Sequence, residues 1–299
     1  MTRPTAELSA ALALCLACAA EAPPPPAAAP AASTLTLPVT DLDGLSSLAV
    51  GEGGGLFTLP ERRPVLLELS PTGAEVRRSP LVGAPDGLEF ESLAWLGGQR
   101  FAVGTEGGCE AGAERVLLIS RDGDAARVDG VVELPLAAWG TTCDRYRGVE
   151  GLCAASGRLV AALEAVVDAD ERLAPLARVD LATGEPTALR LALTSTKEQG
   201  GKISSLDCRA RDGALEVLAV ERHFNLARVI GFTLPLDGPA PAAPLRPRIL
   251  VDLAPHADGG TRNFEGLARL DERHVLLIVD NFYGRVTGPN ELLALELPP

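Results

Sequence analysis

Carboxylates recur at two places of a pattern that the chain repeats five times, and grouped carboxylates can bind a metal ion or transfer protons. Each copy starts with Glu or Ser, continues with Gly or Ser and Leu, and is followed 14 to 17 residues after its start by an acid. The copies begin at Ser46, Glu91, Glu150, Ser204 and Glu265. The later acids are Glu61, Glu106, Glu164, Glu221 and Asp280.

Carboxylate oxygens are the ligands that hard divalent cations prefer. The repeated acids therefore predict a metal site, with Ca²⁺ as the expected ion, and its candidate ligands are Glu91, Glu150, Glu265 and Asp280. Like charges that gather at one place raise each other's pKa values, so such a site also needs compensating cations.

Basic residues stand beside several of these acids. Arg147, Lys202 and Arg262 precede copies of the pattern, and Arg222 directly follows Glu221. These cations either bind an anionic oxygen, phosphate above all, or pair with the carboxylates in a ring that fixes the structure. Repetition favours the structural ring, because architecture repeats whereas an active site usually does not.

Other signals for catalysis are sparse. Glu221 and His223 are the candidates for acid–base chemistry, because both stand at the end of one hydrophobic run. The chain has no Gly-x-Ser-x-Gly elbow, no phosphate-binding loop and no His-Glu-x-x-His motif. A Ser-His-Asp hydrolase is therefore not indicated.

The elements that must position these residues are strands. Short runs rich in Val, Ile and Leu alternate with Gly, Asp and Pro turns in every repeat, which predicts an all-β fold and a single β-propeller. Five blades are favoured, and six is the alternative. In a propeller the innermost strand starts, and the second strand ends, at the same face, so the acids are expected around one channel mouth.

The last repeat is one strand short. Glu291–Leu297 is its final strand, while Thr34–Val39 is a strand without a repeat of its own. We expect the N-terminal strand to complete the last blade, because this closes the ring and covers a sheet edge that would promote aggregation.

The N-terminus and the composition indicate an exported protein. Residues 1–18 resemble an export signal, either that of a lipoprotein with Cys18 as the lipidated residue or an ordinary cleaved signal. Residues 19–32 form a Pro/Ala-rich tether, and 33–299 the propeller domain. The expected location is the periplasm, the outer membrane through a lipid anchor, or the exterior. A net charge of −13 argues against binding to nucleic acid, and allows membrane association only through that anchor.

Four cysteines follow the leader, an even number that suggests disulfides in an exported chain. Cys109 and Cys143 both fall in loops expected at the mouth, so we predict a disulfide between them. Cys153 and Cys208 occupy nearly equivalent places in adjacent innermost strands and are predicted to be neighbours, bonded or not.

Several short motifs resemble the phytase-like family, which is described by its esterase-like activity. They are Glu150-Gly151-Leu152 with Leu159–Glu164, Val217–Phe224, and Asn263–Ala268 with Val275–Phe282. The resemblance covers nearly all of 40–299 and implies a propeller with phosphomonoester or ester hydrolase activity. Ser46 and Ser204 break the ring of glutamates, which counts against a site with several calcium ions.

Two functions are compatible with these features. One is a metal-assisted phosphoesterase in which Glu91, Glu150 and Glu265 hold Ca²⁺ and the nearby arginines neutralise the phosphate. The alternative is a non-catalytic envelope lipoprotein whose mouth binds a small anionic or phosphorylated ligand, or an envelope protein.

Overall fold

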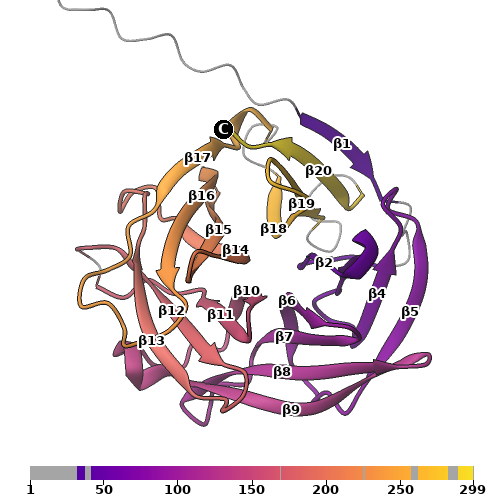
Figure 1. Cartoon of the computed structure of the whole chain (residues 1–299), viewed down its shortest axis with the longest axis horizontal. Coiled ribbons are helices and arrows are strands. Elements are labelled where there is room, and N and C mark those ends of the chain that lie inside the picture. The colour runs from indigo at the N-terminus through magenta and orange to yellow at the C-terminus, as the bar shows by residue number, and fades with distance from the viewer. Residues whose placement is uncertain are drawn as a thin grey trace, which may run out of the picture.

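The computed structural model describes residues 32–37, 42–168, 170–224, 226–256, 262–281 and 289–298. Their strands form five four-stranded blades around a common centre (Figure 1). The predicted all-β, five-bladed propeller is therefore confirmed, and the alternative of six blades is wrong. The export signal, Cys18 and most of the tether lie outside the described residues.

Blades 1 and 2 share one sheet. Blade 1 contains β2 (Ala49–Val50), β3 (Leu56–Thr58), β4 (Val65–Leu69) and β5 (Glu75–Val82). Blade 2 contains β6 (Glu89–Gly97), β7 (Arg100–Glu106), β8 (Ala113–Asp122) and β9 (Ala125–Pro135). Their outermost strands pair in parallel where Leu81 and Val82 lie beside Ala126 and Arg127, which joins the two blades at the rim.

Blades 3 and 4 are separate antiparallel sheets. Blade 3 contains β10 (Val149–Ala155), β11 (Arg158–Leu163), β12 (Leu173–Asp180) and β13 (Pro186–Ala192). Blade 4 contains β14 (Lys202–Arg211), β15 (Ala214–His223), β16 (Leu226–Pro235) and β17 (Arg248–Asp252). Single-turn 3₁₀ helices lie at Glu52–Gly54, Leu136–Trp139 and Ala254–His256. No helix in the described part of the chain is long and apolar enough to cross a membrane.

Blade 5 joins the two ends of the chain. It contains β18 (Asn263–Arg269), β19 (His274–Asp280), β20 (Glu291–Glu296) and β1 (Ala32–Thr36). β1 pairs antiparallel with β20 from Ala32 opposite Leu295 to Thr36 opposite Glu291. The predicted closure by an N-terminal strand is confirmed, although this strand starts two residues earlier and ends at Thr36; residues 38–41 lie outside the description.

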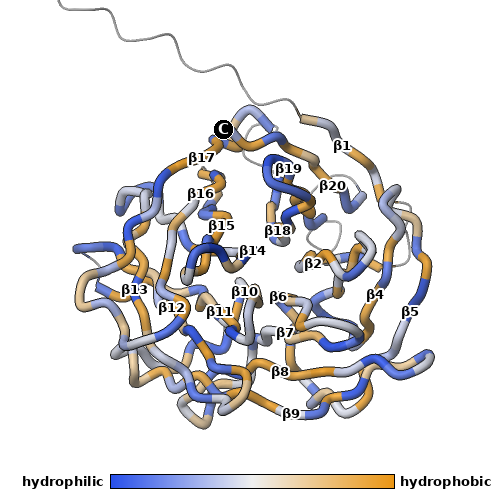
Figure 2. The backbone as a smooth tube through the Cα atoms, viewed as in Figure 1, coloured by the Kyte–Doolittle hydropathy of each residue, from blue (hydrophilic) through white to orange (hydrophobic). Residues whose placement is uncertain are grey.

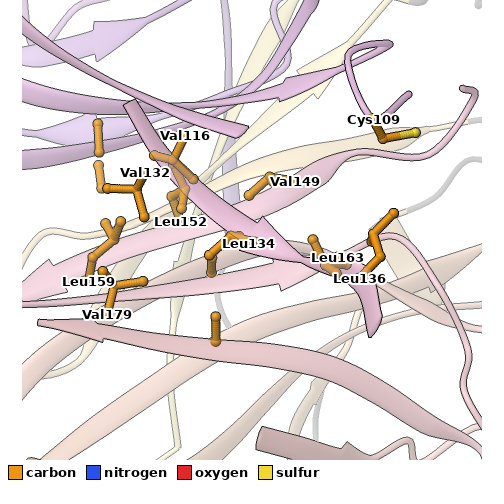
Figure 3. Packing of buried hydrophobic residues seen from close by; sticks show 14 of the residues in the cluster. Cys109, Val116, Val132, Leu134, Leu136, Val149, Leu152, Leu159, Leu163 and Val179 are labelled. Atoms are coloured by element: carbon orange, nitrogen blue, oxygen red, sulfur yellow. The ribbon is translucent and has the colours of Figure 1, made fainter. Parts of the chain in front are cut away.

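The core lies between the blades. Along β11, Leu159 and Ala161 pack toward blade 2, whereas Val160 and Ala162 pack toward blade 4. Alternate side chains of a strand point to opposite faces, and both faces of a blade are covered. This burial on both faces explains the continuous apolar runs in the sequence. The orange segments of Figure 2 follow these strands, and Figure 3 shows the packing of blades 2 and 3.

Candidate functional site

In four of the five repeats, a β-bulge places one residue at the channel mouth, the face at which the innermost strands start. In blades 2 to 5, the pairing of the first two strands skips one residue. The skipped residues are Glu91, Glu150, Ser204 and Glu265. A bulge redirects a side chain that regular pairing would hold in a sheet face, and bulges are frequent beside functional sites. In these four blades, the first residue of the repeated sequence pattern is thus the residue in the bulge.

The bulged residues of blades 2 and 3 line a narrow crevice near the centre of the ring. It is too tight to admit a water molecule and is lined by residues from blades 1 to 4, among them Ser46, Glu91 and Glu150. Glu91 and Glu150 are only 7% and 5% exposed. Neither carboxylate forms a hydrogen bond or ion pair with any residue that the structure describes.

Two groups of carboxylates gather on this side of the mouth. Oxygens of Glu91, Glu106 and Glu150 lie within 4.8 Å of one another, and so do oxygens of Glu61, Glu89 and Glu91. Glu91 belongs to both groups. We call these five residues the acidic cluster. Its geometry suits a metal ion, since one cation would have oxygen ligands at such separations.

Burial raises the pKa values in the acidic cluster, and neighbouring carboxylates raise them further. The pKa values of Glu91 and Glu150 lie well above the ordinary value, chiefly through burial. Burial, then Asp280 and Glu265, raise the pKa of Glu61 to about 9. Burial and Glu89 raise the pKa of Glu106 to about 8. Without a cation, the cluster therefore retains protons at neutral pH.

On the other side of the mouth, basic and amide side chains pair with the carboxylates. Arg222 forms an ion pair with Glu265, and Asn263 donates hydrogen bonds to Glu265 at 2.7 Å and to Asp280 at 3.1 Å. Lys202 pairs with Glu164 at 3.1 Å. On this side of the mouth, the contacts are those of the structural ring of ion pairs that the sequence suggested.

Two of the expected anion-binding arginines point to other acids. Arg147 pairs with Asp144 at 3.0 Å, and both side chains are more than 40% exposed. Arg262 pairs with Glu291 of blade 5 at 3.0 Å. Arg222 and Lys202 pair with acids of the repeated pattern, namely Glu265 and Glu164.

A model of the phytase-like family, described as "Esterase-like activity of phytase", matches residues 40–282. The chain belongs to the phytase-like family. Among curated proteins, none matches this sequence.

Solved structures with a similar backbone include three family-43 glycoside hydrolases. A β-1,3-galactosidase is 9% identical with a TM-score of 0.52, and the match covers 88% of this chain and 93% of that chain. A thermostable member is 10% identical with a TM-score of 0.51, covering 88% and 92%. The exo-β-1,3-galactanase of Phanerochaete chrysosporium is 12% identical with a TM-score of 0.51, covering 88% and 62%. At such identity the likeness supports the propeller fold alone.

In this phytase-like propeller, Glu221 is part of the structural framework. It is fully buried, and its carboxylate accepts hydrogen bonds from the backbone amides of Thr194 at 3.0 Å and Ser195 at 2.8 Å, and from the Thr194 hydroxyl. His223 packs against Phe224, with ring centroids 4.7 Å apart. The two candidates for acid–base chemistry therefore have different surroundings, one enclosed and one near the surface.

The serines of the repeated pattern link neighbouring blades. The Ser46 hydroxyl donates to the Phe90 carbonyl at 2.6 Å, directly before Glu91. Ser204 donates in the same way to Phe264, directly before Glu265, at 3.0 Å. At both positions where the phytase-like chain has Ser instead of Glu, the serine therefore supports the bulge of the next blade.

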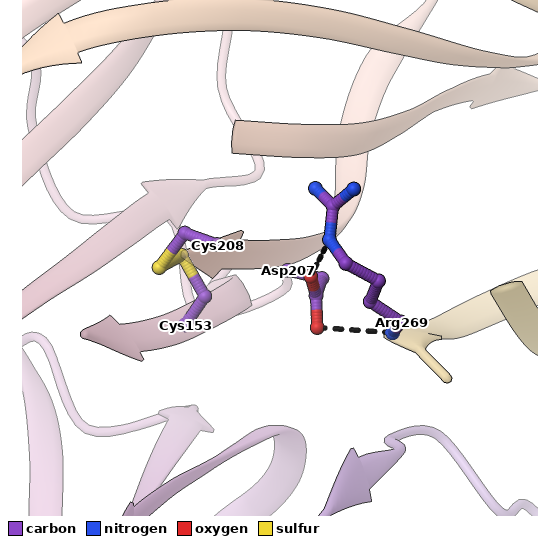
Figure 4. The surroundings of a disulfide bond; sticks show 4 residues. All are labelled: Cys153, Asp207, Cys208 and Arg269. Carbon is purple, nitrogen blue, oxygen red and sulfur yellow. Dashed lines mark hydrogen bonds and ion pairs between the residues drawn. A yellow bond between two sulfur atoms is a disulfide. The ribbon is translucent and has the colours of Figure 1, made fainter. Parts of the chain in front are cut away.

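Two disulfides reinforce the phytase-like ring. Cys109 and Cys143 are bonded with Cα atoms 5.3 Å apart, as predicted, and tie the segment after β7 to the one before β10. Cys153 and Cys208 are also bonded, with Cα atoms 5.5 Å apart, and join the innermost strands of blades 3 and 4 (Figure 4). Beside this second bond, Asp207 accepts hydrogen bonds from the backbone and side chain of Arg269 in blade 5.

Sequence reasoning missed Glu89 as a member of the acidic cluster. A signal was present, because Glu89 is two residues before Glu91 and the bulge brings both toward Glu61. The spacing of buried residues around each bulge was a further signal. Phe90 and Leu93, or Val149 and Leu152, are three residues apart rather than the two of a regular strand.

Proposed function

We propose that the acidic cluster binds a divalent cation, Ca²⁺, and that the loaded mouth hydrolyses esters. The gathering of Glu91, Glu106 and Glu150 within 4.8 Å, with no ion pair to Glu91 or Glu150 among the described residues, carries this proposal. Oxygens that share one Ca²⁺ at about 2.3–2.6 Å are at most about 5 Å apart, so the three carboxylates fit the ion.

The surrounding residues set the charge of the site. Arg222 neutralises Glu265 and, with Asn263, holds it in place across the mouth from the cluster. The charge of Glu265 contributes to the raised pKa values of Glu61 and Glu150, whereas the charge of Arg222 lowers the pKa of Glu150. In this arrangement Glu265 and Asp280 do not ligate the ion and act on it only through electrostatic attraction.

The family description supports ester hydrolysis as the reaction. A bound divalent cation supplies polarisation of a phosphoryl or carbonyl oxygen and activation of water. The chain's own part would be to hold that cation with Glu106 and with the bulged Glu91 and Glu150, at a mouth open to the attacking water. A phosphomonoester is the proposed substrate class, and the two disulfides support the proposed export of the protein.

Calorimetric titration with Ca²⁺ after chelator treatment tests the metal site. We expect binding by the wild type and its loss in Glu91→Gln/Glu150→Gln, because two hard ligands are removed. Glu185→Gln is the matched control, since it removes an exposed carboxylate from a turn in blade 3. Equal Ca²⁺ binding by all three proteins would contradict the site.

Turnover of p-nitrophenyl phosphate and p-nitrophenyl acetate, with Ca²⁺ or with chelator, tests the activity. We expect hydrolysis of the phosphate ester that chelator abolishes. Hydrolysis that persists unchanged in chelator would exclude the metal-assisted mechanism.

A non-catalytic role is the second candidate, and the serines at the mouth favour it. The hydroxyls of Ser46, Ser92 and Ser204 donate to backbone carbonyls, and those of Ser47 and Ser205 accept from backbone amides. These hydroxyls are therefore engaged in structure rather than paired with a base. Ca²⁺ binding without turnover of either ester would identify an envelope propeller that binds a small anionic ligand or a protein partner.

A further inference from the structure

A large groove opens between blades 4 and 5 because the outer strand of blade 4 is short. β17 pairs with β16 only as far as Gly231, which lies opposite Arg248. The preceding segment is held by blade 3 instead, where Leu245 bridges Leu191 and the Ala192 amide donates to the Leu245 carbonyl at 2.9 Å. The end of β16 therefore lacks an outer neighbour, and a cavity of about 700 Å³ results.

This groove lies on the face opposite the acidic cluster. β14 starts near the mouth, with Ser204 in its bulge, and ends at Arg209 and Arg211 on the wall of the groove. β18 runs the same way from Glu265 to Arg269. The length of the innermost strands thus separates the two sites.

The groove concentrates positive charge in a chain whose net charge is −13. Its lining contains two glutamates, Glu216 and Glu272, and six arginines: Arg209, Arg211, Arg246, Arg248, Arg269 and Arg273. The volume is that of a site for a small organic molecule. The arginines come from strands and turns of both blades.

Most of these guanidinium groups have partners, but two do not. Arg209 pairs with Glu216 at 2.7 Å and with Glu272 at 2.5 Å. Arg269 is bonded to Asp207. Arg246 and Arg248 are exposed and form no ion pair or hydrogen bond with the described part of the chain. Their forks of donors are therefore open to an external anion.

Apolar surface lies beside the free arginines. Phe232 and Leu250 of blade 4 and Leu297 of blade 5 line the same groove. A ligand that fits both features has an anionic head and an apolar body, in the way that small-molecule sites combine a mostly apolar wall with a few placed polar groups.

We propose that this groove binds a phosphate monoester with an apolar substituent. The phosphate lies against Arg246 and Arg248, and the substituent packs toward Phe232 and Leu250. Phosphate is favoured over carboxylate because its three terminal oxygens can accept from two guanidinium forks at once. This binding does not depend on the metal or the chemistry proposed for the mouth.

Titration of the full-length protein with phenyl phosphate, in buffer with chelator, tests the proposal. We expect binding at one site, weakened about tenfold or more in Arg246→Gln/Arg248→Gln because charge-assisted hydrogen bonds are lost. The matched control is Arg100→Gln. Arg100 is an exposed arginine of blade 2 without an ion pair to the described residues, and this variant should bind within about twofold of wild type. Both altered arginines are exposed, and an unchanged melting temperature verifies the fold.

Two further probes separate the sources of affinity. Inorganic phosphate should bind more weakly than phenyl phosphate, because it lacks the apolar body, and benzoate should bind more weakly because it has one fewer terminal oxygen. Hydrogen exchange should slow in β17 when phenyl phosphate binds. Chelator removes divalent cations from the mouth, so this result stands apart from the test of the metal site.

Several results would overturn the proposal. They are no binding of phenyl phosphate, equal affinity in the double variant, or tighter binding of benzoate. Concentration-dependent dimers that disappear in the double variant, without phenyl phosphate binding, would assign the groove to a second copy of the chain instead.

Discussion

Glu91 belongs to both carboxylate groups of the acidic cluster. Burial raises its pKa, and the charges of Glu150, Glu61 and Glu106 raise it further. A carboxyl group whose pKa is higher in the folded protein than in the unfolded chain binds more protons when folded. Such a group stabilises the fold at low pH, and this contribution is lost as pH rises through the folded pKa.

Without divalent cations, we expect the wild type to lose stability as pH rises from about 4.5 toward 9, the window set by the raised pKa of Glu61. Glu91→Gln should flatten this decline, because a neutral amide replaces a carboxyl whose charge is unfavourable here. The same variant should lose the rise in melting temperature that Ca²⁺ causes in the wild type. Melting temperatures across pH, with and without Ca²⁺, measure both effects.

Glu185→Gln serves as the control for these melts, because it removes an exposed charge far from the mouth. If Glu91→Gln and the control show the same pH dependence as the wild type, burial of charge at Glu91 does not govern the stability.

Glu265→Gln, unlike Glu91→Gln, should lower the stability of the protein. It removes the charge partner of Arg222, whose side chain is 24% exposed beside a Glu265 side chain that is 6% exposed. Breaking a buried ion pair on one side costs more than the pair contributes, so we expect a loss of roughly 2–4 kcal/mol, with or without Ca²⁺. Urea unfolding measures it.

The double variant Glu265→Gln/Arg222→Met is the comparison for that loss. It removes both charges and should recover part of the stability. A double variant less stable than the sum of its single changes would show that the ion pair is not the cause.

At the scale of elements, the bulges explain how one strand can place some side chains in the core and another at the mouth. Phe264 and Leu267 are buried on either side of the bulge in β18, and Glu265 turns toward the mouth. Gly266 then lets the strand approach blade 1, since an added Cβ would lie 2.6 Å from the Leu48 nitrogen and 2.7 Å from the Ser47 carbonyl carbon. The close approach joins the last blade to the first.

Gly266→Ala should therefore destabilise the ring by about 1–3 kcal/mol, because the backbone of blade 1 must move away from the new methyl group. Chemical denaturation measures the change. Gly130→Ala in β9 is the matched control, because its added Cβ would meet side-chain atoms of Leu118 no closer than 3.8 Å. Equal stability of the two variants would contradict the close contact.

For the whole molecule, closure depends on a strand whose five side chains are all exposed. β1 contributes through its ladder with β20 and through Leu37, which is buried in the core between blades 5 and 1. Without it, the hydrogen-bonding groups of β20 would form an open sheet edge.

Deletion of residues 32–37 should cost roughly 3–6 kcal/mol, since several ladder hydrogen bonds and one buried leucine are lost. It should also promote aggregation that increases with protein concentration. Thermal unfolding and light scattering measure these effects, and deletion of 19–30 is the control. Equal melting temperatures for the two deletions would contradict closure by β1.

Much of the fold follows from the sequence by itself. Five copies of one pattern, each with strand-length apolar runs, specify five blades, because strands buried on both faces need such runs. The strand left over at the N-terminus and the one missing at the C-terminus predict closure. Equivalent places in neighbouring repeats likewise predict that Cys153 and Cys208 are neighbours, since equivalent residues of adjacent blades lie close in space; the bond between them is seen in the structure.

Only the tertiary structure decides which equivalent acids have partners. Glu91 and Glu265 occupy the same bulge in sequence, yet Arg222 reaches Glu265 from the neighbouring blade and no described cation pairs with Glu91. The arginine groove is also invisible in sequence, since Arg209, Arg248 and Arg273 are far apart along the chain. Charge pairing and cavities depend on distances across blades, which local patterns do not encode.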